Sequence, residues 1–269
     1  GINVSTVLRN LGIKSRALGF VAGFTGREIV SELEKLGVQS EFITIDSGVS
    51  RINVKLKSVD GTEINGRGPD IDGKSLDKLM DKLDRLENGD VLFLSGSIPE
   101  CVPDDIYSRI MAMLNGRGIT VVVDATRELL MNVLEYRPFL IKPNNHELGE
   151  IFGVELSSRA EVVPYARALQ KQGAVNVLVS MAGEGAVLVA VDGQVYESEA
   201  PKGKLVNGVG AGDSMVAGFM AGWLEKNDYR HAFYMGLAAG SASAFSEYLA
   251  TKEEIGKVYN EAVNRLQKA

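Results

Sequence analysis

The amino-acid sequence predicts an α/β protein with a doubly wound, mostly parallel sheet flanked by helices. Short apolar, β-branched segments alternate along the chain with longer amphipathic segments, which is typical of repeated βαβ units. Two of the short segments, 91–95 and 119–124, are apolar on both faces, as expected for strands that helices cover on each side of a sheet. The 269 residues, 45% of them hydrophobic, can bury a sizeable core without a disulfide.

The strand candidates are the short apolar runs, and the helix candidates are the amphipathic stretches between them. Together they predict a single domain over residues 1–269. In chain order, strands are expected at 17–21, 42–45, 52–59, 91–95, 119–124, 139–142, 175–181 and 186–191. Helices are expected at 3–11, 25–36, 74–86, 103–114, 127–134, 145–152, 158–172, 210–225, 229–248 and 252–266.

The segment 41–69 departs from this alternation, because it carries strand patterns with no helix between them. Its stretch 52–57 alternates apolar and polar residues, as half-exposed antiparallel strands do. We interpret the segment as a small β-sheet that leaves the main sheet and serves as a lid or an interface. A β-meander packed on the edge of the main sheet is the alternative.

Because side chains alternate along a strand, one face of this β segment collects basic and amide groups. In an acidic chain such a face can clamp a phosphorylated substrate, and arginine suits bidentate contact with phosphate. A solvated face that prevents edge aggregation is an equally good account. The side chains concerned are Arg51, Asn53, Lys55 and Lys57 on one face, with Asn65 and Arg67 further along the segment.

Composition and charge argue against several classes of protein. The chain has 29 basic and 35 acidic residues, a net charge of −6, and so lacks the basic excess of a nucleic-acid-binding protein. No apolar run approaches the ~20 residues that span a bilayer, so no membrane role is expected. A single cysteine, Cys101, excludes an intrachain disulfide and favours a reducing, cytoplasmic setting. The two histidines, His146 and His231, do not favour a histidine-rich zinc site.

Residues 68–75 match the Walker A spacing, but we reject a phosphate-binding loop there. Such a loop follows a buried strand and offers backbone N–H groups, whereas the preceding residues 63–67 are polar and Pro69 has no N–H. Asp70 and Asp72 would also place two carboxylates beside the phosphates. A loop that ends in a helix start is the better interpretation.

A second glycine-rich segment, 207–214, leads into a long apolar helix. It differs from a dinucleotide fingerprint, because the third glycine position holds Asp213 and the motif comes late in the chain. The N–H groups of residues 210–213 would point out of the helix start, where the dipole favours an anion. Asp213 could take a proton from a hydroxyl while these N–H groups stabilise a transferring phosphoryl group. An aspartate that caps the helix is the alternative.

The polar residues 142–147 end a strand candidate and are therefore expected at the carboxyl edge of the sheet, where open α/β folds bind ligands. Lys142 could pair there with a phosphate, and Asn144 and Glu147 could hold Mg²⁺ through water. A proline turn in which Asn144 caps the next helix is the alternative. His146 has no evident partner, so we expect a surface or capping role for it.

Two serine-containing segments are weaker signals. Ser95 ends a buried strand at the same edge, where its hydroxyl could hold a polar ligand. The segment 180–185 lies between two apolar strands, and a hairpin-like connection explains it about as well as a ligand site. The sequence does not favour a serine hydrolase, since it lacks a Gly-x-Ser-x-Gly elbow and has two histidines in all.

Taken together, these motifs resemble the ribokinase-like PfkB family of carbohydrate kinases, and the resemblance covers essentially the whole chain. Gly-Ala-Gly-Asp opening a helix, Asn-x-x-Glu after a strand, and the β excursion occur in the order that the family shows. Within the family the sequence is most similar to members that phosphorylate fructose 1-phosphate. The segments that carry this similarity are 1–5, 50–57, 62–66, 94–99, 142–148, 180–185 and 209–219.

The resemblance implies a role for each matching residue. Asp213 would be the general base, and Gly210, Ala211 and Gly212 would form the anion hole. The residues implied to contact ATP are Lys142, Asn144, Ser180, Met181, Ala182, Gly183, Glu184, Gly185 and Gly212. Those implied to hold Mg²⁺ are Asn144 and Glu147. Those implied to contact the sugar phosphate are Asn3, Arg51, Ser95 and Asp213.

The implied reaction is ATP-dependent phosphorylation of fructose 1-phosphate at its C6 hydroxyl, which gives fructose 1,6-bisphosphate. Tagatose 6-phosphate is the alternative substrate, and a non-catalytic sensor of sugar phosphates or nucleotides is the alternative of another class. Asp213 among its glycines argues against a sensor, which needs no base. The family's β lid usually builds a dimer, so we expect a homodimer.

The sequence departs from the family at its start. Family members begin with a further strand that carries a substrate-binding aspartate, followed by Gly-Gly-Lys, whereas this sequence opens inside a helix candidate. We expect an N-terminal strand and part of the lid to be missing from it, through truncation or mobility. If they are absent from the molecule, sugar binding should be weak or lost, and an intact-mass measurement separates the two cases.

Overall fold

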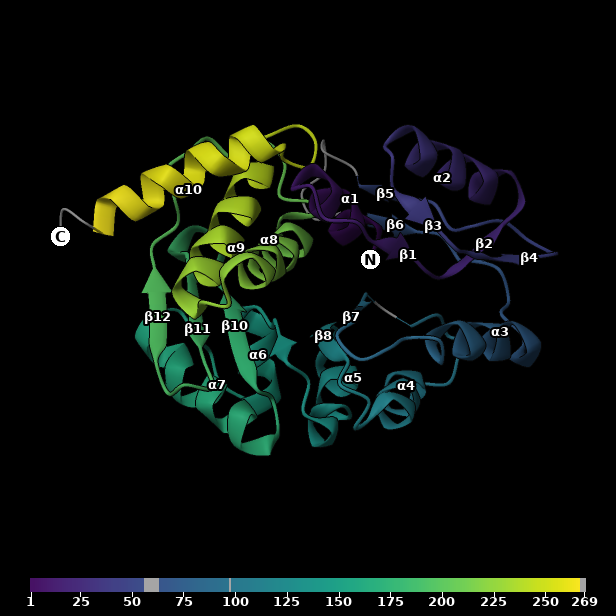
Figure 1. Ribbon diagram of the computed structural model, residues 1–269, viewed down its shortest axis with the longest axis horizontal. Coiled ribbons are helices and arrows are strands. Elements are labelled where there is room, and N and C mark those ends of the chain that lie inside the picture. Colours follow the sequence, from purple (N-terminus) through teal and green to yellow (C-terminus); the bar gives the residue numbers. More distant parts are fainter. Residues whose placement is uncertain (56–62, 97, 267–269) are drawn as a thin grey trace.

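The computed structural model describes residues 1–55, 63–96 and 98–266, and Figure 1 shows two groups of elements. The larger group is a six-stranded sheet with helices on both of its faces. The smaller group consists of short two-stranded sheets beside helix α2. The end of the expected strand 52–59, with Lys57, lies outside the described residues.

The six-stranded sheet confirms the predicted, mostly parallel architecture. Strands β7 to β10 run parallel, whereas β11 pairs antiparallel with β10 on one side and with β12 on the other. Strand β12 is not among the expected strands, because none of its four residues is buried and they do not form an apolar run. The spatial order is β12-β11-β10-β9-β8-β7, with bounds β7 Val91–Ser95, β8 Thr120–Asp124, β9 Leu140–Ile141, β10 Asn176–Ser180, β11 Ala186–Val189 and β12 Val195–Ser198.

Helices cover both faces of this sheet, which explains why its central strands are apolar on both sides. Val121 and Val123 of β8 pack into one helical layer, whereas Val122 between them packs into the other. No helix in the described parts of the chain is long and apolar enough to cross a bilayer. The first layer contains α3 Gly73–Leu83, α4 Ile106–Leu114, α5 Arg127–Met131, the 3₁₀ turn Leu134–Tyr136, α6 Asn145–Phe152 and α7 Arg159–Gln172; the second contains α1 Ile2–Asn10, α8 Ala211–Lys226, α9 Tyr229–Ala244 and α10 Lys252–Leu266.

One helix ends clearly earlier than its sequence pattern predicts. The helix expected over 229–248 ends at Ala244, because the carbonyl of Ala244 accepts the N–H groups of Val206 and Asn207 from the loop before α8. The other helices differ from their expected bounds by at most three residues at either end. The strand expected at 17–21 is divided into two shorter strands, β1 and β2.

The N-terminal part of the chain forms three two-stranded sheets beside the main sheet. Two of them are parallel pairs, β1 with β3 and β2 with β4, and α2 connects their strands. The third, the antiparallel β5–β6 pair, is the small β-sheet expected within 41–69. The bounds are β1 Arg16–Ala17, β2 Phe20–Ala22, α2 Gly23–Lys35, β3 Gln39–Ser40, β4 Ile43–Ile45, β5 Asn53–Lys55 and β6 Glu63–Asn65.

Small residues allow α8 and α9 to pack closely together. A Cβ atom on Gly218 of α8 would lie 2.5 Å from the Cβ of Ala239 and 2.5 Å from the carbonyl oxygen of Met235, both on α9. The absence of a side chain at this position therefore sets the separation of the two helices. This packing also places the first turn of α8, which carries Asp213, relative to the sheet.

We predict that Gly218→Ala lowers the free energy of unfolding by about 1–2 kcal/mol, because steric overlap outweighs the ~1 kcal/mol gain in helix propensity. Gly256→Ala in α10 is the matched control. No atom lies within 4 Å of its Cβ position, so stability should rise by up to about 1 kcal/mol. Urea unfolding of both variants checks this, and a change of the same sign in both would contradict it.

Candidate active site

The carboxyl ends of β8 and β9 bring an aspartate and a lysine together. In the parallel ladder Val123 lies opposite Ile141, so Asp124 and Lys142 follow as neighbours. The Nζ of Lys142 lies 3.2 Å from Oδ1 of Asp124, and the two side chains are 7% and 20% exposed. Burial raises the pKa of Asp124, and the Lys142 ammonium opposes that rise. The result is a buried ion pair at the edge where open α/β sheets bind ligands.

The first turn of α8 lies over this ion pair. A Cβ atom on Gly212 would be 3.3 Å from Nζ of Lys142, so glycine at this position leaves room for the ammonium. Asp213, the next residue, is half-buried in the same turn. Its carboxylate is near enough to Asp124 to contribute to the raised pKa of that group. Positive charge, a helix N-terminus and two carboxylates therefore meet at one place.

The hydrogen bonds of this turn differ in one respect from the expectation. Gly210 begins the helix with a φ of 81°, a left-handed conformation that favours glycine. The N–H of Ala211, which the sequence pattern predicts to be free, donates to the carbonyl of Gly208 at 3.3 Å, because the chain folds back at Gly210. The N–H groups of Gly212 and Asp213 have no hydrogen-bond partner in the described parts of the chain.

A side chain from the opening of the sequence orients Asp213. The Nδ2 of Asn3, on α1, donates to Oδ2 of Asp213 at 2.9 Å. The other carboxylate oxygen, Oδ1, makes no hydrogen bond to a described residue and keeps its lone pairs. Asn3 was expected to face a sugar phosphate, and its hydrogen bond to the proposed base is a contact that the motifs do not reveal.

Asn144 and Glu147 close the N-terminus of α6 in a capping box. Oδ1 of Asn144 accepts the N–H of Glu147 at 2.8 Å, and Oε2 of Glu147 accepts the N–H of Asn144 at 2.8 Å. The capping alternative is thus present in the structure. The Glu147 carboxylate is also near enough to Asp124 to raise the pKa of that group. The described residues contain no cluster of three or more His, Cys, Asp or Glu side chains arranged to hold a metal.

Residues 180–185 form the connection between β10 and β11, as the hairpin interpretation predicts. The turn is tight, since Gly185 has a φ of 95° and a Cβ there would collide with the carbonyl oxygen of Ser198. The N–H of Ser180 donates to the carbonyl of Pro143 at 3.1 Å. The turn therefore lies beside the strand edge that carries the ion pair.

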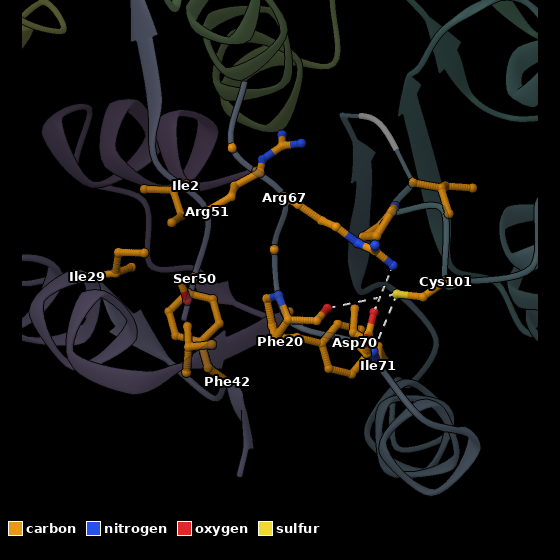
Figure 2. A pocket seen from close by; sticks show the side chains of 18 of the residues that line it. Ile2, Phe20, Ile29, Phe42, Ser50, Arg51, Arg67, Asp70, Ile71 and Cys101 are labelled. Atoms are coloured by element: carbon orange, nitrogen blue, oxygen red, sulfur yellow. Dashed lines mark hydrogen bonds and ion pairs between the residues drawn. The ribbon is translucent and has the colours of Figure 1, made fainter. Parts of the chain in front are cut away.

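A cavity of about 720 Å³ lies between the main sheet and the small β-sheets (Figure 2). Asn3, Arg51 and Ser95, which the resemblance assigns to the sugar phosphate, all line it. Figure 2 shows the side chains of Arg51 and Arg67 extending into this space. The Oγ of Ser95 is buried and has no hydrogen-bond partner among the described residues. The residues assigned to ATP lie outside the lining of this cavity.

The β5–β6 sheet has a polar face and an apolar face. Its register pairs Asn53 with Asn65, and continuing the same register places Arg51 opposite Arg67. Arg51, Asn65 and Arg67 line the cavity, so the polar face is directed towards it. Val54 and Ile64 pair on the alternate face, and the exposed apolar side chains there are Ile52, Val54 and Ile64, at 58%, 42% and 58% exposure.

Asp124 is a site residue that the sequence motifs do not single out. One signal was available, because an acidic residue ends the otherwise apolar run 119–124 at the carboxyl edge of the sheet. Its partner Lys142, however, follows from the register of β8 and β9, which the sequence pattern does not reveal.

The Walker-like segment is a loop followed by a helix start, as predicted. Helix α3 begins at Gly73, and Oδ1 of Asp72 caps it by accepting the N–H of Ser75 at 2.8 Å. Lys74 is exposed and lies outside the lining of the cavity. The segment therefore offers no phosphate-binding loop at the site.

A mostly parallel sheet whose carboxyl edge carries a helix N-terminus, a buried lysine and an oriented aspartate is typical of α/β enzymes that transfer phosphoryl groups. Comparison with known proteins specifies the family. The profile of the pfkB family of carbohydrate kinases matches residues 1–255, and the chain belongs to this family.

The chain is also similar to individual proteins of known activity or structure. The chain is 46% identical over 267 residues to a 1-phosphofructokinase of Bacillus subtilis, and the aligned region covers 99% of this chain and 88% of that protein. It is 35% identical over 254 residues to a D-tagatose-1-phosphate kinase of Bacillus licheniformis, and the aligned region covers 93% of this chain and 82% of that protein. The solved structure of phosphofructokinase-2 from Escherichia coli in complex with fructose-6-phosphate superposes with a TM-score of 0.86 at 26% identity, over 98% of this chain and 86% of that one.

We predict that Lys74→Ala changes kcat and KM of the kinase reaction by no more than about twofold, as expected for a surface substitution away from a binding site. Steady-state kinetics with ATP as the varied substrate checks this. A 100-fold loss of kcat would show that the Walker-like segment contacts the nucleotide after all.

Proposed function

We propose that the protein transfers the γ-phosphoryl group of ATP to the C6 hydroxyl of fructose 1-phosphate, giving fructose 1,6-bisphosphate. The observation that carries the proposal is the position of Asp213. Its carboxylate is held by Asn3, a residue of the cavity wall, and its helix turn lies over Lys142. The two relatives named above support the choice of a ketohexose 1-phosphate. ATP as substrate and the lone thiol of Cys101 agree with a cytoplasmic setting.

Asp213 is the general base in this proposal. Its Oδ1 takes the proton of the C6 hydroxyl as the hydroxyl oxygen attacks the γ-phosphorus, and the bond from that phosphorus to the bridging oxygen breaks so that ADP leaves. Asn3 keeps the carboxylate in place by holding Oδ2. The N–H groups of Gly212 and Asp213 stabilise charge on the transferring group, and Gly210 and Ala211 shape the turn that presents them.

Lys142 and the turn 180–185 form the ATP side of the site. The Lys142 ammonium is buried next to the start of α8, where it can pair with a phosphate oxygen. The turn 180–185 is tied to Pro143 and lies beside Asn144, where the nucleotide can extend along it. This arrangement suits phosphoryl transfer, which depends on positioning and charge neutralisation more than on covalent help.

The residues at this edge fit a hydrated Mg²⁺ ion. The carboxylates of Glu147 and Asp213 are near enough to Asp124 to raise its pKa, and Lys142 is the one ammonium paired with Asp124 among the described residues. The edge therefore carries an excess of negative charge before ATP arrives. Asn144 and Glu147 can hold the ion through water, because a capping oxygen retains a second lone pair. Mg²⁺, when bound, neutralises phosphate oxygens of ATP.

The sugar phosphate occupies the polar part of the cavity. Arg51 is directed into it and can bind the phosphate group in a bidentate manner. The buried hydroxyl of Ser95 lacks a partner, and a buried polar group of this kind is stabilised by a hydrogen bond from a ligand. Asn3 connects this cavity to Asp213, so the C6 hydroxyl and the base meet at its border.

A coupled ADP-release assay with ATP and Mg²⁺ tests the function. Fructose 1-phosphate should give the highest kcat/KM, against tagatose 1-phosphate, tagatose 6-phosphate and fructose 6-phosphate as competitors. A preference for either tagatose phosphate would correct the sugar while leaving the kinase assignment in place. ATP binding without ADP release on any of the four would favour the sensor alternative.

We predict that Asp213→Asn lowers kcat by about 10²–10⁴-fold, the usual contribution of a positioned general base. ATP affinity by calorimetry should stay within about twofold of the parent, because the amide keeps the size of the carboxylate. The matched control is Asp192→Asn in the exposed turn between β11 and β12, where the carboxylate accepts the N–H of Gln194. Turnover that survives in Asp213→Asn would remove this residue from the role of base.

We also propose a homodimer formed through the β5–β6 sheet. Ile52, Val54 and Ile64 share the face that points away from the cavity, and all three are exposed. Contiguous apolar side chains on a two-stranded sheet are typical of an interaction surface. A second copy of the chain can cover this face without blocking the cavity, which the opposite face lines.

We predict that Ile64→Lys shifts the protein to monomers, because an ammonium at the centre of an apolar interface would be buried without a partner. Sedimentation velocity at several protein concentrations measures the change. Val191→Lys is the control, since Val191 is 55% exposed but follows β11, near the β12 edge of the main sheet. A parent protein that is monomeric at all concentrations would contradict the proposal.

A further inference from the structure

We propose that Asp124 is a positioning residue for phosphoryl transfer: its carboxylate holds the ammonium of Lys142 against the first turn of α8, in place for the phosphates of ATP. The inference rests on the proposed function, because it concerns the ATP side of that reaction. Asp124 lies outside the lining of the cavity, and its role is exerted through Lys142.

The backbone on both sides of the ion pair is held in the sheet. The N–H of Lys142 donates to the carbonyl of Val123 at 3.2 Å, so the lysine continues the ladder between β8 and β9. The carbonyl of Asp124 accepts the N–H of Gly96 at 3.0 Å, which ties it to the end of β7. Two side chains on adjacent parallel strands at the same register point the same way, so their 3.2 Å contact follows from the fold.

Lys142 occupies a position where a cation is unfavourable without a partner. Its side chain is 7% exposed, and the first turn of α8 carries partial positive charge. A Cβ on Gly212 would lie 3.3 Å from Nζ and 3.6 Å from Cε of Lys142, so the ammonium lies next to that turn. A buried ammonium needs a nearby anion, and Asp124 is the carboxylate within ion-pair distance of it in the described parts of the chain.

Asp124 also keeps the cation apart from the proposed base. Asp213 lies one residue beyond Gly212, and its carboxylate is near enough to Asp124 to raise the pKa of that group. Asp213 and Glu147 are the other carboxylates near Asp124, and a lysine released from Asp124 that paired with Asp213 would draw the proposed base away from the substrate hydroxyl. With Asp124 in place, the ammonium and the base are held separately before substrates arrive, which is the arrangement that electrostatic preorganisation requires.

A double-mutant cycle tests the inference. ATP affinity is measured by calorimetry without sugar, and kcat and KM by ADP release, for Asp124→Asn, Lys142→Met and the double variant. Asp124→Asn should weaken ATP binding and lower kcat by about 10- to 100-fold, as a misplaced group does, while KM for the sugar phosphate changes less than about twofold. The double variant should match Lys142→Met, because Asp124 has no effect once the lysine is gone.

Asp84→Asn is the matched control, since Asp84 pairs with Arg117 at 2.7 Å at the surface, and it should leave both measurements unchanged. Asp124→Asn leaves a buried ammonium unpaired and can fold poorly. The comparison of Lys142→Met with the double variant then carries the test, since neither leaves the ammonium in place. Equal ATP affinities support the inference, and a further loss in the double variant shows that Asp124 acts directly and overturns it.

The calorimetric cycle and the turnover assay separate this inference from the proposed function. If the losses of ATP affinity in the two single variants do not add up in the double variant, and no sugar phosphate is turned over, the positioning role is retained and the kinase reaction is rejected. If these losses add up in the double variant and the enzyme is active, the positioning role alone is rejected. A parent protein that does not bind ATP would reject both.

Discussion

The buried ion pair between Asp124 and Lys142 is the interaction around which the site is arranged. It forms because β8 and β9 run parallel in a register that makes the residues after Val123 and Ile141 neighbours. The ammonium then limits what can lie above it, and glycine at position 212 lets the start of α8 approach. A helix N-terminus placed over a cation would normally be unfavourable, and the aspartate compensates for it. This ion pair therefore places charge beside the start of α8, where the proposed phosphoryl transfer would take place.

The two sides of the site are built by different parts of the chain. The proposed nucleotide side belongs to the main sheet, where strand ends and a capped helix supply its residues. The proposed sugar side is the cavity between this sheet and the small β-sheets, and the polar face of β5–β6 forms part of its wall. Because strand residues alternate, the opposite face of β5–β6 is apolar and exposed. One short sheet thus connects the substrate cavity with the surface proposed for a second copy of the chain.

Much of the fold could be predicted, because helices and strands of this class leave strong local patterns. The apolar strands, the helix after Asn144 and the helix start after Asp72 follow from periodicity and capping residues that lie close together in the sequence. The features that the sequence did not predict correctly have local causes too. Strand β12 is short and has no buried residue, and the N–H of Ala211 is taken up by Gly208 because Gly210 reverses the chain. The resemblance of the sequence motifs predicted the family to which the chain belongs.

By itself, the sequence determined the α/β class, the glycine-rich start of α8 with Asp213 in its first turn, and the rejection of the Walker-like segment. The class follows from the periodicity and order of short segments along the chain, and the two helix starts follow from capping and turn residues close to them in sequence. Only the tertiary structure decided which carboxylate faces Lys142 and which side chain orients Asp213. Asn3 and Asp213 are 210 positions apart, and Asp124 meets Lys142 through strand register. Such contacts depend on how helices and strands pack, and packing is a property of the whole core that no local pattern encodes.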